Sequence, residues 1–151
     1  MTVANVKEFL SANGVPHIVI KHPLAFTATS VAGAAHIPGT EMAKVVVVNL
    51  DGKPVMAVLP ADRHVDLERL RLSAGATTAE LTHEREFTAD FPGCEVGAMP
   101  PFGNLYGLEV LVDPHLAQDK EIAFNAGTHT ELIRMAYEDF ERLVKPRLVA
   151  M

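Results

Sequence analysis

The sequence predicts a single α+β domain around a mixed β-sheet, and three observations lead to this prediction. The chain has 151 residues, which suits one domain with one continuous core. No repeat, low-complexity segment or Pro/Gly/Ser-rich linker divides it. Segments with the periodicity of strands and of helices both occur, but they do not alternate as regular strand-helix-strand units, which favours α+β over α/β.

The amino-terminal part of the chain predicts a helix, a strand and a second helix. Residues 3–12 carry apolar side chains at helical spacing and end before an Asn-Gly pair, a glycine stop typical of helices. Residues 17–22, HIVIKH, predict a short strand. Residues 29–37 predict a short helix, with Thr29 or Ser30 as its N-terminal cap.

Residues 43–50 and 53–60 predict a β-hairpin. The Asp-Gly pair between the two segments favours the type I′ turn that joins tightly twisted strands. Four consecutive valines, residues 45–48, show no polar alternation. The first strand of the hairpin is therefore expected to be buried on both faces.

The rest of the chain continues the mixture of helices and strands. An amphipathic helix that ends near a glycine follows the hairpin, and a closing helix is stopped by Pro146. The expected helices are residues 64–75, 82–93 and 137–146, and the expected strands are residues 105–113, 120–127 and 128–135.

The composition excludes several classes of function. A formal net charge of −6 argues against a protein that grips long stretches of duplex DNA, since such proteins neutralise many phosphates; it is compatible with a few contacts at a nucleic-acid end. No apolar run approaches the roughly 20 residues of a membrane span, and the amino terminus lacks the pattern of a signal peptide. The single cysteine, Cys94, excludes an internal disulfide framework, so we expect a cytoplasmic protein.

The sequence lacks the residue patterns of several familiar catalytic and metal-binding sites. None of the three serines lies in a G-x-S-x-G turn, and Cys94 fits a packing residue better than a nucleophile. The seven histidines are scattered, with no H-E-x-x-H and no Cys/His pairing, so we expect no metal site. The chain has no P-loop and no G-x-G-x-x-G, and no cofactor is expected.

Three short features remain. Lys44 stands at the start of the valine-rich strand, where a lysine that extends to solvent would be the ordinary explanation. Residues 97–103, GAMPPFG, form a rigid loop without a reactive side chain, which alone could be a connector. Residues 124–129, FNAGTH, run from a strand into a turn that ends at His129. Each feature is weak alone, whereas their order and spacing are much more specific.

In this order the three features resemble the YbaK family, which includes the editing domain of bacterial prolyl-tRNA synthetases and its freestanding relatives. The resemblance covers nearly the whole chain, up to the closing helix with DFERL. It implies one editing domain over residues 1–151, with a curled mixed sheet surrounded by helices. The implied function is that of a freestanding deacylase, which hydrolyses mischarged aminoacyl-tRNA carrying a small amino acid such as Ala, Ser or Cys.

The resemblance also implies partners. The expected partner is the acceptor end of an aminoacyl-tRNA, with an aminoacyl-tRNA synthetase as a further candidate, and neither a membrane nor duplex DNA is expected. The deacylase would act in trans, because no synthetase body is attached in this sequence. One branch that removes alanine has a polar residue after the lysine; this chain has Val45 there, so we do not assign it to that branch.

Roles for single residues follow from the same resemblance. Lys44 matches a lysine that is required for activity and lies near the acceptor end. Gly97 to Pro101 match a loop that lies against the aminoacyl group. Asn125, Gly127 and His129 match residues that border the same pocket in some branches, and the histidine is replaced in others.

The loop suits this chemistry through its backbone. An aminoacyl ester is already activated, so its hydrolysis needs an aimed water and donors for the developing oxyanion, which fixed backbone N–H groups supply. Consecutive prolines fix φ at two positions, and the flanking glycines permit close approach. We therefore assign the chemistry to Lys44, Gly97 and Pro101. Substrate binding is expected at Ala98, Met99, Pro100, Phe102, Gly103, Asn125, Gly127 and His129, with Met99, Pro100 and Phe102 as walls of a small apolar pocket.

Two other functions remain open. A non-catalytic module of the same fold would hold tRNA ends or a synthetase; the absence of a side-chain nucleophile and base favours it, and the presence of Lys44 and Gly97 argues against it. A small structural or DNA-associated protein is the third possibility, and the negative charge argues against its DNA-binding form.

Overall fold

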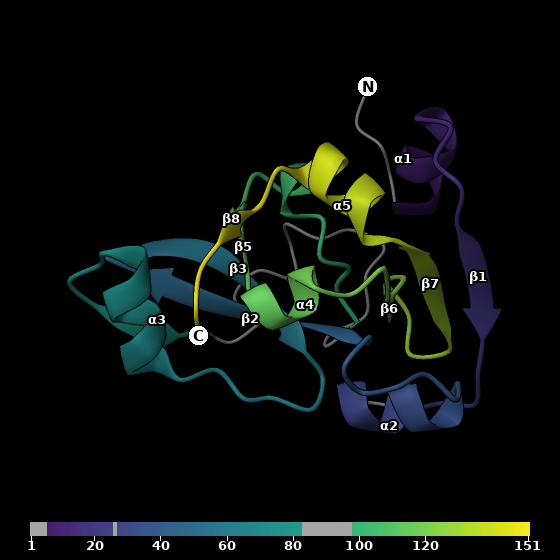
Figure 1. The fold of residues 1–151 in the computed structure, drawn as a ribbon, viewed down its shortest axis with the longest axis horizontal. Helices are drawn as coiled ribbons and strands as arrows, with labels where there is room; N and C mark the ends of the chain where they lie inside the picture. The colour runs from purple at the N-terminus through teal and green to yellow at the C-terminus, as the bar shows by residue number, and fades with distance from the viewer. Residues whose placement is uncertain (1–5, 26, 83–97) are drawn as a thin grey trace.

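The structure, a computed structural model, describes residues 6–25, 27–82 and 98–151. Helices and strands are mixed along these segments, as predicted for an α+β protein (Figure 1). The helices are α1 (Val6–Ala12), α2 (Ala28–Ala34), α3 (Leu67–Ala74), the 3-10 helix η3 (Gly103–Leu105), α4 (Pro114–Ala117) and α5 (Tyr137–Val144). The strands are β1 (Ile18–Lys21), β2 (Ala43–Leu50), β3 (Lys53–Pro60), β4 (Ala79–Leu81), β5 (Glu109–Val112), β6 (Glu121–Asn125), β7 (Glu131–Ala136) and β8 (Arg147–Leu148). The predicted helix 82–93 lies, apart from Thr82, outside the described residues.

Hydrogen bonds divide these strands into two sheets. In the three-stranded sheet, β7 lies between β1 and β6, and both pairings are antiparallel. The five-stranded sheet has the order β4-β2-β3-β5-β8 and is mixed, since β5 pairs in parallel with both β3 and β8. A parallel bridge between Met42 and Ala123 connects the two sheets, and the Ala123 N–H donates to the Glu41 carbonyl at 3.0 Å. The start of β2 therefore lies beside β6.

The predicted hairpin is confirmed in β2 and β3, which pair from Ala43 with Pro60 to Leu50 with Lys53. Asp51 and Gly52 both have positive φ, 52° and 79°, as a type I′ turn requires. The Asp51 carboxylate also accepts hydrogen bonds of 2.8 Å from the N–H groups of two consecutive threonines before β4. The turn residue thus helps to hold β4 at the edge of the sheet.

The predicted burial of β2 on both faces is confirmed at Val47 and Val48, whereas Val45 and Val46 are half-buried. Val47 is 1% exposed and packs into the largest apolar cluster, whereas Val48 is 0% exposed and packs into a second cluster with Leu70 of α3. Successive side chains of a strand point to opposite faces, so the valine run supplies both clusters.

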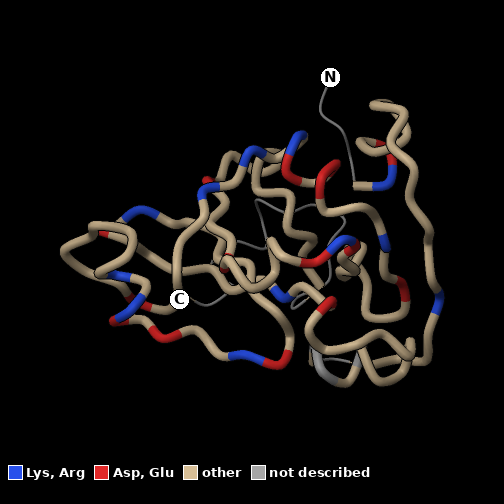
Figure 2. Tube along the Cα trace, viewed as in Figure 1, with Lys and Arg blue, Asp and Glu red and all other residues tan. Residues whose placement is uncertain are grey.

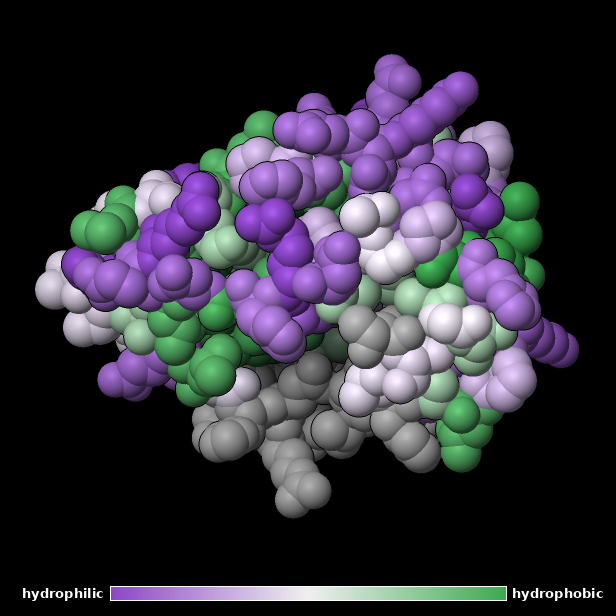
Figure 3. Space-filling view, turned by 60° about the horizontal axis from the view of Figure 1, so that its bottom comes forward, coloured by the Kyte–Doolittle hydropathy of each residue, from purple (hydrophilic) through white to green (hydrophobic). Residues whose placement is uncertain are grey.

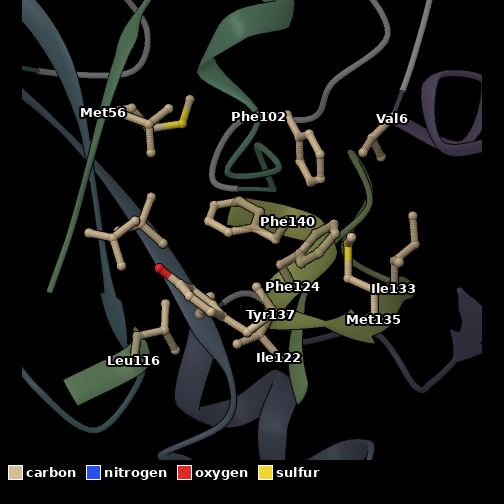
Figure 4. Packing of buried hydrophobic residues seen from close by; sticks show 14 of the residues in the cluster. Val6, Met56, Phe102, Leu116, Ile122, Phe124, Ile133, Met135, Tyr137 and Phe140 are labelled. Carbon is tan, nitrogen blue, oxygen red and sulfur yellow. The ribbon is translucent and has the colours of Figure 1, made fainter. Parts of the chain in front are cut away.

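Phe102 belongs to the largest cluster and packs close to Phe124 and Phe140 (Figure 4). Its ring centroid lies 5.9 Å from that of Phe9 and 5.4 Å from those of Phe124 and Phe140. These rings come from α1, β6 and α5, and aromatic pairs at such separations add to the burial of their large apolar surface. The end of the predicted proline loop is therefore anchored in the core.

Helix ends follow local chemistry, with small shifts from the prediction. The Asp66 carboxylate caps α3 by accepting from the Arg69 N–H at 3.1 Å, and Gly75 ends it with φ 74°. The cap of α2 is Thr27 rather than the predicted Thr29 or Ser30, because the Thr27 hydroxyl accepts from the Ser30 N–H at 3.1 Å.

Short elements account for most of the remaining differences. The predicted strand 105–113 is shortened to β5 because η3 and a turn occupy its first residues. The sequence did not predict β4, α4 or β8, whose two to four residues are too few to show a period. Helix α5 ends at Lys145 in the left-handed conformation, φ 52°, one residue before the predicted stop at Pro146.

The surface is mixed in charge. Lys and Arg are spread along the chain among Asp and Glu (Figure 2). On the face turned forward in Figure 3, hydrophilic residues cover the upper part and hydrophobic residues gather in patches beside them. Within the described segments, no helix combines the length and the apolar character that crossing a membrane requires.

Candidate active site

The loop predicted to carry the chemistry is described from Ala98 onward, and Gly97 lies outside the described residues. Ala98 is fully buried, and both prolines are buried as well. The Gly127 N–H donates to the Ala98 carbonyl at 2.9 Å, and Gly127 adopts φ 93°, which glycine accommodates without strain. The proline loop and the turn after β6 are therefore joined directly.

The backbone of this loop has donors to offer. The N–H groups of Ala98 and Met99 form no hydrogen bond with any residue that the structure describes. Fixed N–H groups of this kind are suited to stabilise an oxyanion. Pro100 and Pro101 have no N–H and serve by fixing the direction of the chain.

Asn125, the last residue of β6, presents a second free polar group. It pairs with Leu132 of β7, which pairs with Ile20 of β1, so the three side chains form one row on one face of the sheet. Asn125 is 8% exposed, and its buried Oδ1 has no hydrogen-bond partner among the described residues. Such an acceptor costs free energy unless a partner reaches it, which makes it a candidate contact for a substrate.

Lys44 comes two residues after Met42 on β2, and Asn125 comes two residues after Ala123 on β6; a parallel bridge joins Met42 to Ala123. Each side chain lies on the same face of its own strand as the bridge residue, so we expect Lys44 and Asn125 to be neighbours. The Lys44 ammonium forms no ion pair or hydrogen bond with a described residue. Burial lowers the pKa of Lys44 below its ordinary value, and the nearby Asp62 carboxylate partly opposes this shift.

His129 lies at the same end of the three-stranded sheet. It is 5% exposed, and its carbonyl accepts from the Ala25 N–H at 3.3 Å. The neighbouring Thr130 carbonyl accepts from the His22 N–H at 2.9 Å, so residues 22–25 run alongside the turn. Figure 1 shows α2, which follows this segment, near the ends of β1 and β7.

Phe102 and Gly103, both predicted to contact the substrate, pack against the protein itself. Phe102 is 0% exposed among its three ring partners, so it offers no surface for a substrate and acts as a core anchor instead of the predicted pocket wall. A Cβ on Gly103 would lie 2.6 Å from the Leu108 carbonyl oxygen, so the close approach at this glycine is made by the protein's own chain. Met99, at 5% exposed, also packs into the largest cluster.

Two residues were missed by the sequence analysis. Asp62 acts on Lys44 electrostatically and lines a pocket of about 230 Å³, together with Thr40, Pro60, Arg63, His115, Gln118 and Asp119. His22 is 8% exposed, and its Nε2 is buried and has no hydrogen-bond partner in the part of the chain that the structure describes. Neither residue belongs to a spacing motif, so only the tertiary neighbours single them out.

Metal binding has no visible basis in the part of the chain that the structure describes. No group of three or more His, Cys, Asp or Glu side chains is placed there to hold an ion. The site is instead a set of backbone N–H groups, two buried acceptors and one ammonium.

Comparisons with known proteins identify what this arrangement belongs to. A family model for the aminoacyl-tRNA editing domain matches residues 22–143. The multifunctional Ser/Thr-tRNA deacylase ProXp-y of Escherichia coli (strain K12) is 32% identical over 148 residues, covering 93% of this chain and 86% of that protein.

Solved structures show the same fold. The hypothetical protein APE2540 has a TM-score of 0.82 at 19% identity, over 95% of this chain and 97% of that one. A proposed trans-editing enzyme for prolyl tRNA synthetase has a TM-score of 0.81 at 19% identity, over 97% of this chain and 94% of that one.

These findings define the class of protein as an aminoacyl-tRNA deacylase, a hydrolase. The chain belongs to the aminoacyl-tRNA editing domain family. The family resemblance drawn from the order of the lysine, the proline loop and the FNAGTH turn is confirmed.

Proposed function

We propose that the protein hydrolyses the ester bond of tRNA mischarged with serine or threonine, using backbone donors of the proline loop and Lys44. The choice of these amino acids is supported by the relative that is named a Ser/Thr-tRNA deacylase. Alanine and cysteine, the other small candidates, remain the comparison substrates. A synthetase discriminates weakly against amino acids that differ from its own by a methylene, so a second site that removes such errors is useful.

The observation that carries this proposal is the hydrogen bond from the Gly127 N–H to the Ala98 carbonyl. It holds the proline loop against the turn that follows Asn125, and the start of β2, which carries Lys44, is bridged to β6, which ends at Asn125. Three segments far apart in the sequence thus meet around unpaired polar groups, as the chemistry of an activated ester requires.

In the proposed reaction, water attacks the ester carbonyl carbon. The N–H groups of Ala98 and Met99, with Gly97 as a further donor, stabilise the oxyanion of the tetrahedral intermediate. The bond from the acyl carbon to the ribose oxygen then breaks, the ribose oxygen takes a proton, and the free amino acid leaves. We infer that the free hydroxyl of the terminal ribose helps to position the water, so no protein nucleophile is needed.

Lys44 binds the terminal phosphate or ribose in this proposal. The Lys44 ammonium has no partner among residues 6–25, 27–82 and 98–151, and such an ammonium is a suitable point charge for a phosphate oxygen. Lys and Arg are interleaved with Asp and Glu along the described chain (Figure 2), and the net charge is −6, so many further phosphate contacts are not expected. We therefore expect a shallow salt dependence of binding, equivalent to about one to three phosphate contacts.

The test measures loss of label from tRNA carrying radiolabelled serine, threonine, alanine or cysteine. We expect wild-type protein to release serine or threonine, Lys44→Ala to lose this activity, and Gly97→Ala to lose most of it because a methyl group would obstruct the substrate. Lys53→Ala is the matched control, since Lys53 is exposed at the opposite end of the same hairpin. If the protein binds every mischarged tRNA and hydrolyses none, it is a binding module and the proposed hydrolysis is wrong.

A synthetase partner is a separate part of the proposal. A solved structure with this fold is that of a proposed trans-editing enzyme for prolyl tRNA synthetase, which supports action in trans. Co-sedimentation of the purified protein with prolyl-tRNA synthetase, with and without tRNA, distinguishes a stable complex from encounter on the shared tRNA.

A further inference from the structure

We propose that His22 accepts a hydrogen bond from the side-chain hydroxyl of the aminoacyl group and thereby selects serine or threonine over alanine. This inference rests on the proposed function and adds to it the residue that reads the substrate side chain. Nothing in the spacing of the sequence singled out His22, which was only one of seven scattered histidines.

The backbone places His22 at the candidate site. Strand β1 pairs with β7 from Ile18 with Arg134 to Lys21 with Glu131, and the His22 N–H extends this ladder by donating to the Thr130 carbonyl at 2.9 Å. Side chains two residues apart on a strand share a face, so His22 lies on the face of Ile20. That is the face on which the row from Ile20 through Leu132 ends at Asn125.

The hydrogen bonding of the imidazole defines what it can bind. Its Nδ1 lies 2.8 Å from the Pro23 carbonyl oxygen, which can only accept, so Nδ1 carries the hydrogen. The Nε2 atom then holds a lone pair and acts as an acceptor. His22 is 8% exposed, and its Nε2 is buried and forms no hydrogen bond with a described residue. A buried acceptor that is held in direction and left unpaired is the arrangement expected for a substrate donor.

The residues around His22 favour an uncharged hydrogen-bond donor to its Nε2. Ile20 and Ala25, on either side of His22, pack against a small apolar cluster that contains Met42, Ala32 and Ala123. An ammonium group brought into such a place would need a carboxylate partner, whereas a hydroxyl needs one hydrogen bond. The Lys44 cation lies on the same face and further disfavours a second cation there.

Selectivity for serine over alanine follows because alanine has no side-chain hydroxyl. Alanine would leave Nε2 unpaired in the complex, and a site built to bond a hydroxyl discriminates strongly against an analogue without one. The thiol of cysteine is a weak donor, so cysteine should fall between serine and alanine. The α-ammonium and the ribose hydroxyls are common to all aminoacyl-tRNAs, so a contact with either would affect every substrate equally.

The test compares kcat/KM for seryl-tRNA and alanyl-tRNA in wild-type protein, His22→Phe and His22→Gln. Phenylalanine keeps a planar ring without the acceptor, and glutamine restores an amide oxygen. We expect His22→Phe to lower the seryl value at least tenfold and the alanyl value less than twofold, with His22→Gln between wild type and His22→Phe. His17→Phe is the matched control, because the Nδ1 of His17 also lies 2.8 Å from a backbone carbonyl oxygen, that of Val15.

Each outcome decides the inference. Equal losses for both substrates, or no change in their ratio in His22→Phe, would overturn it and leave the deacylase function standing. If His22→Phe does not fold, His22→Leu, which also lacks an acceptor, takes its place: an unchanged ratio in His22→Leu overturns the inference and a reduced ratio supports it.

A binding measurement separates this inference from the proposed function. Stable analogues with serine or alanine amide-linked to 3′-amino-3′-deoxyadenosine need no hydrolysis. If wild-type protein releases no amino acid from any tRNA, the proposed function fails. The same titration then tests His22 alone: we expect a tenfold preference for the seryl analogue that disappears in His22→Phe, and equal affinities in wild type contradict the role.

Discussion

Replacing Gly103 by alanine should destabilise the protein by about 2–4 kcal/mol, because the new methyl group meets the backbone. A Cβ at this position would lie 2.6 Å from the Leu108 carbonyl oxygen and 2.7 Å from Cγ2 of Val110. Carbon atoms pack best at roughly 3.5–4.0 Å, so the second contact is about 1 Å too short. The neighbours cannot simply move apart, since the Leu108 N–H donates to the Gly103 carbonyl at 2.9 Å.

The magnitude has two parts. Overpacking of a filled core site costs about 1–3 kcal/mol, and weakening the hydrogen bond between residues 103 and 108 costs about 1 kcal/mol more. In a protein of this size each kcal/mol lowers Tm by roughly 2–4 °C, so a decrease of about 4–16 °C is expected in a thermal melt. Deacylation should fall as well, because Gly103 anchors the end of the proline loop.

Gly33→Ala is the matched control. Gly33 lies inside α2, and an added Cβ would meet no atom within 4 Å. Alanine is favoured over glycine in a helix by about 0.5–1 kcal/mol, so this variant should be slightly more stable than wild type. A melting temperature for Gly103→Ala within about 2 °C of wild type would refute the reasoning, since it would mean that the backbone yields to the methyl group at little cost.

Three further predictions concern the site, the core and a helix cap. Because burial lowers the pKa of Lys44, the catalysed rate should fall as the pH rises through this lowered pKa and the ammonium is lost; Lys44→Arg, which keeps its charge, should not show this decrease once alkaline hydrolysis without enzyme is subtracted. Phe102→Ala should cost about 3–5 kcal/mol in urea unfolding, and a cost under about 1 kcal/mol would contradict its central position among three rings. Asp66→Ala should cost about 1 kcal/mol through loss of the α3 cap and leave deacylation unchanged, whereas an equal stability of the two proteins would show that the cap is replaced.

Local patterns were sufficient where neighbouring residues decide the structure. Asp51 and Gly52 predicted the hairpin turn because positive φ at two consecutive positions is a property of those residue types. The valine run predicted burial on both faces, since a strand without polar alternation has no face for water. The order of Lys44, the proline loop and the FNAGTH turn was specific enough to indicate the family before any contact was known.

Other features depend on pairings between distant segments. The roles of Phe102 and Gly103 were predicted as substrate contacts, but their packing against Phe140 and Leu108 makes them anchors of the loop. His22 could not be found from the sequence, because an unpaired Nε2 becomes significant only when folding removes it from water. The short strands β4 and β8 likewise depend on pairing with β2 and β5.

The sequence by itself determined the turns, the long strands and helices, and the family, because these depend on residue types and on their order along the chain. The tertiary structure alone decided that the Gly127 N–H donates to the Ala98 carbonyl and that the start of β2 lies beside β6. The physical reason is that these hydrogen bonds and this burial form between segments that only folding brings together. The pattern of residues along the chain does not indicate which distant segments will meet.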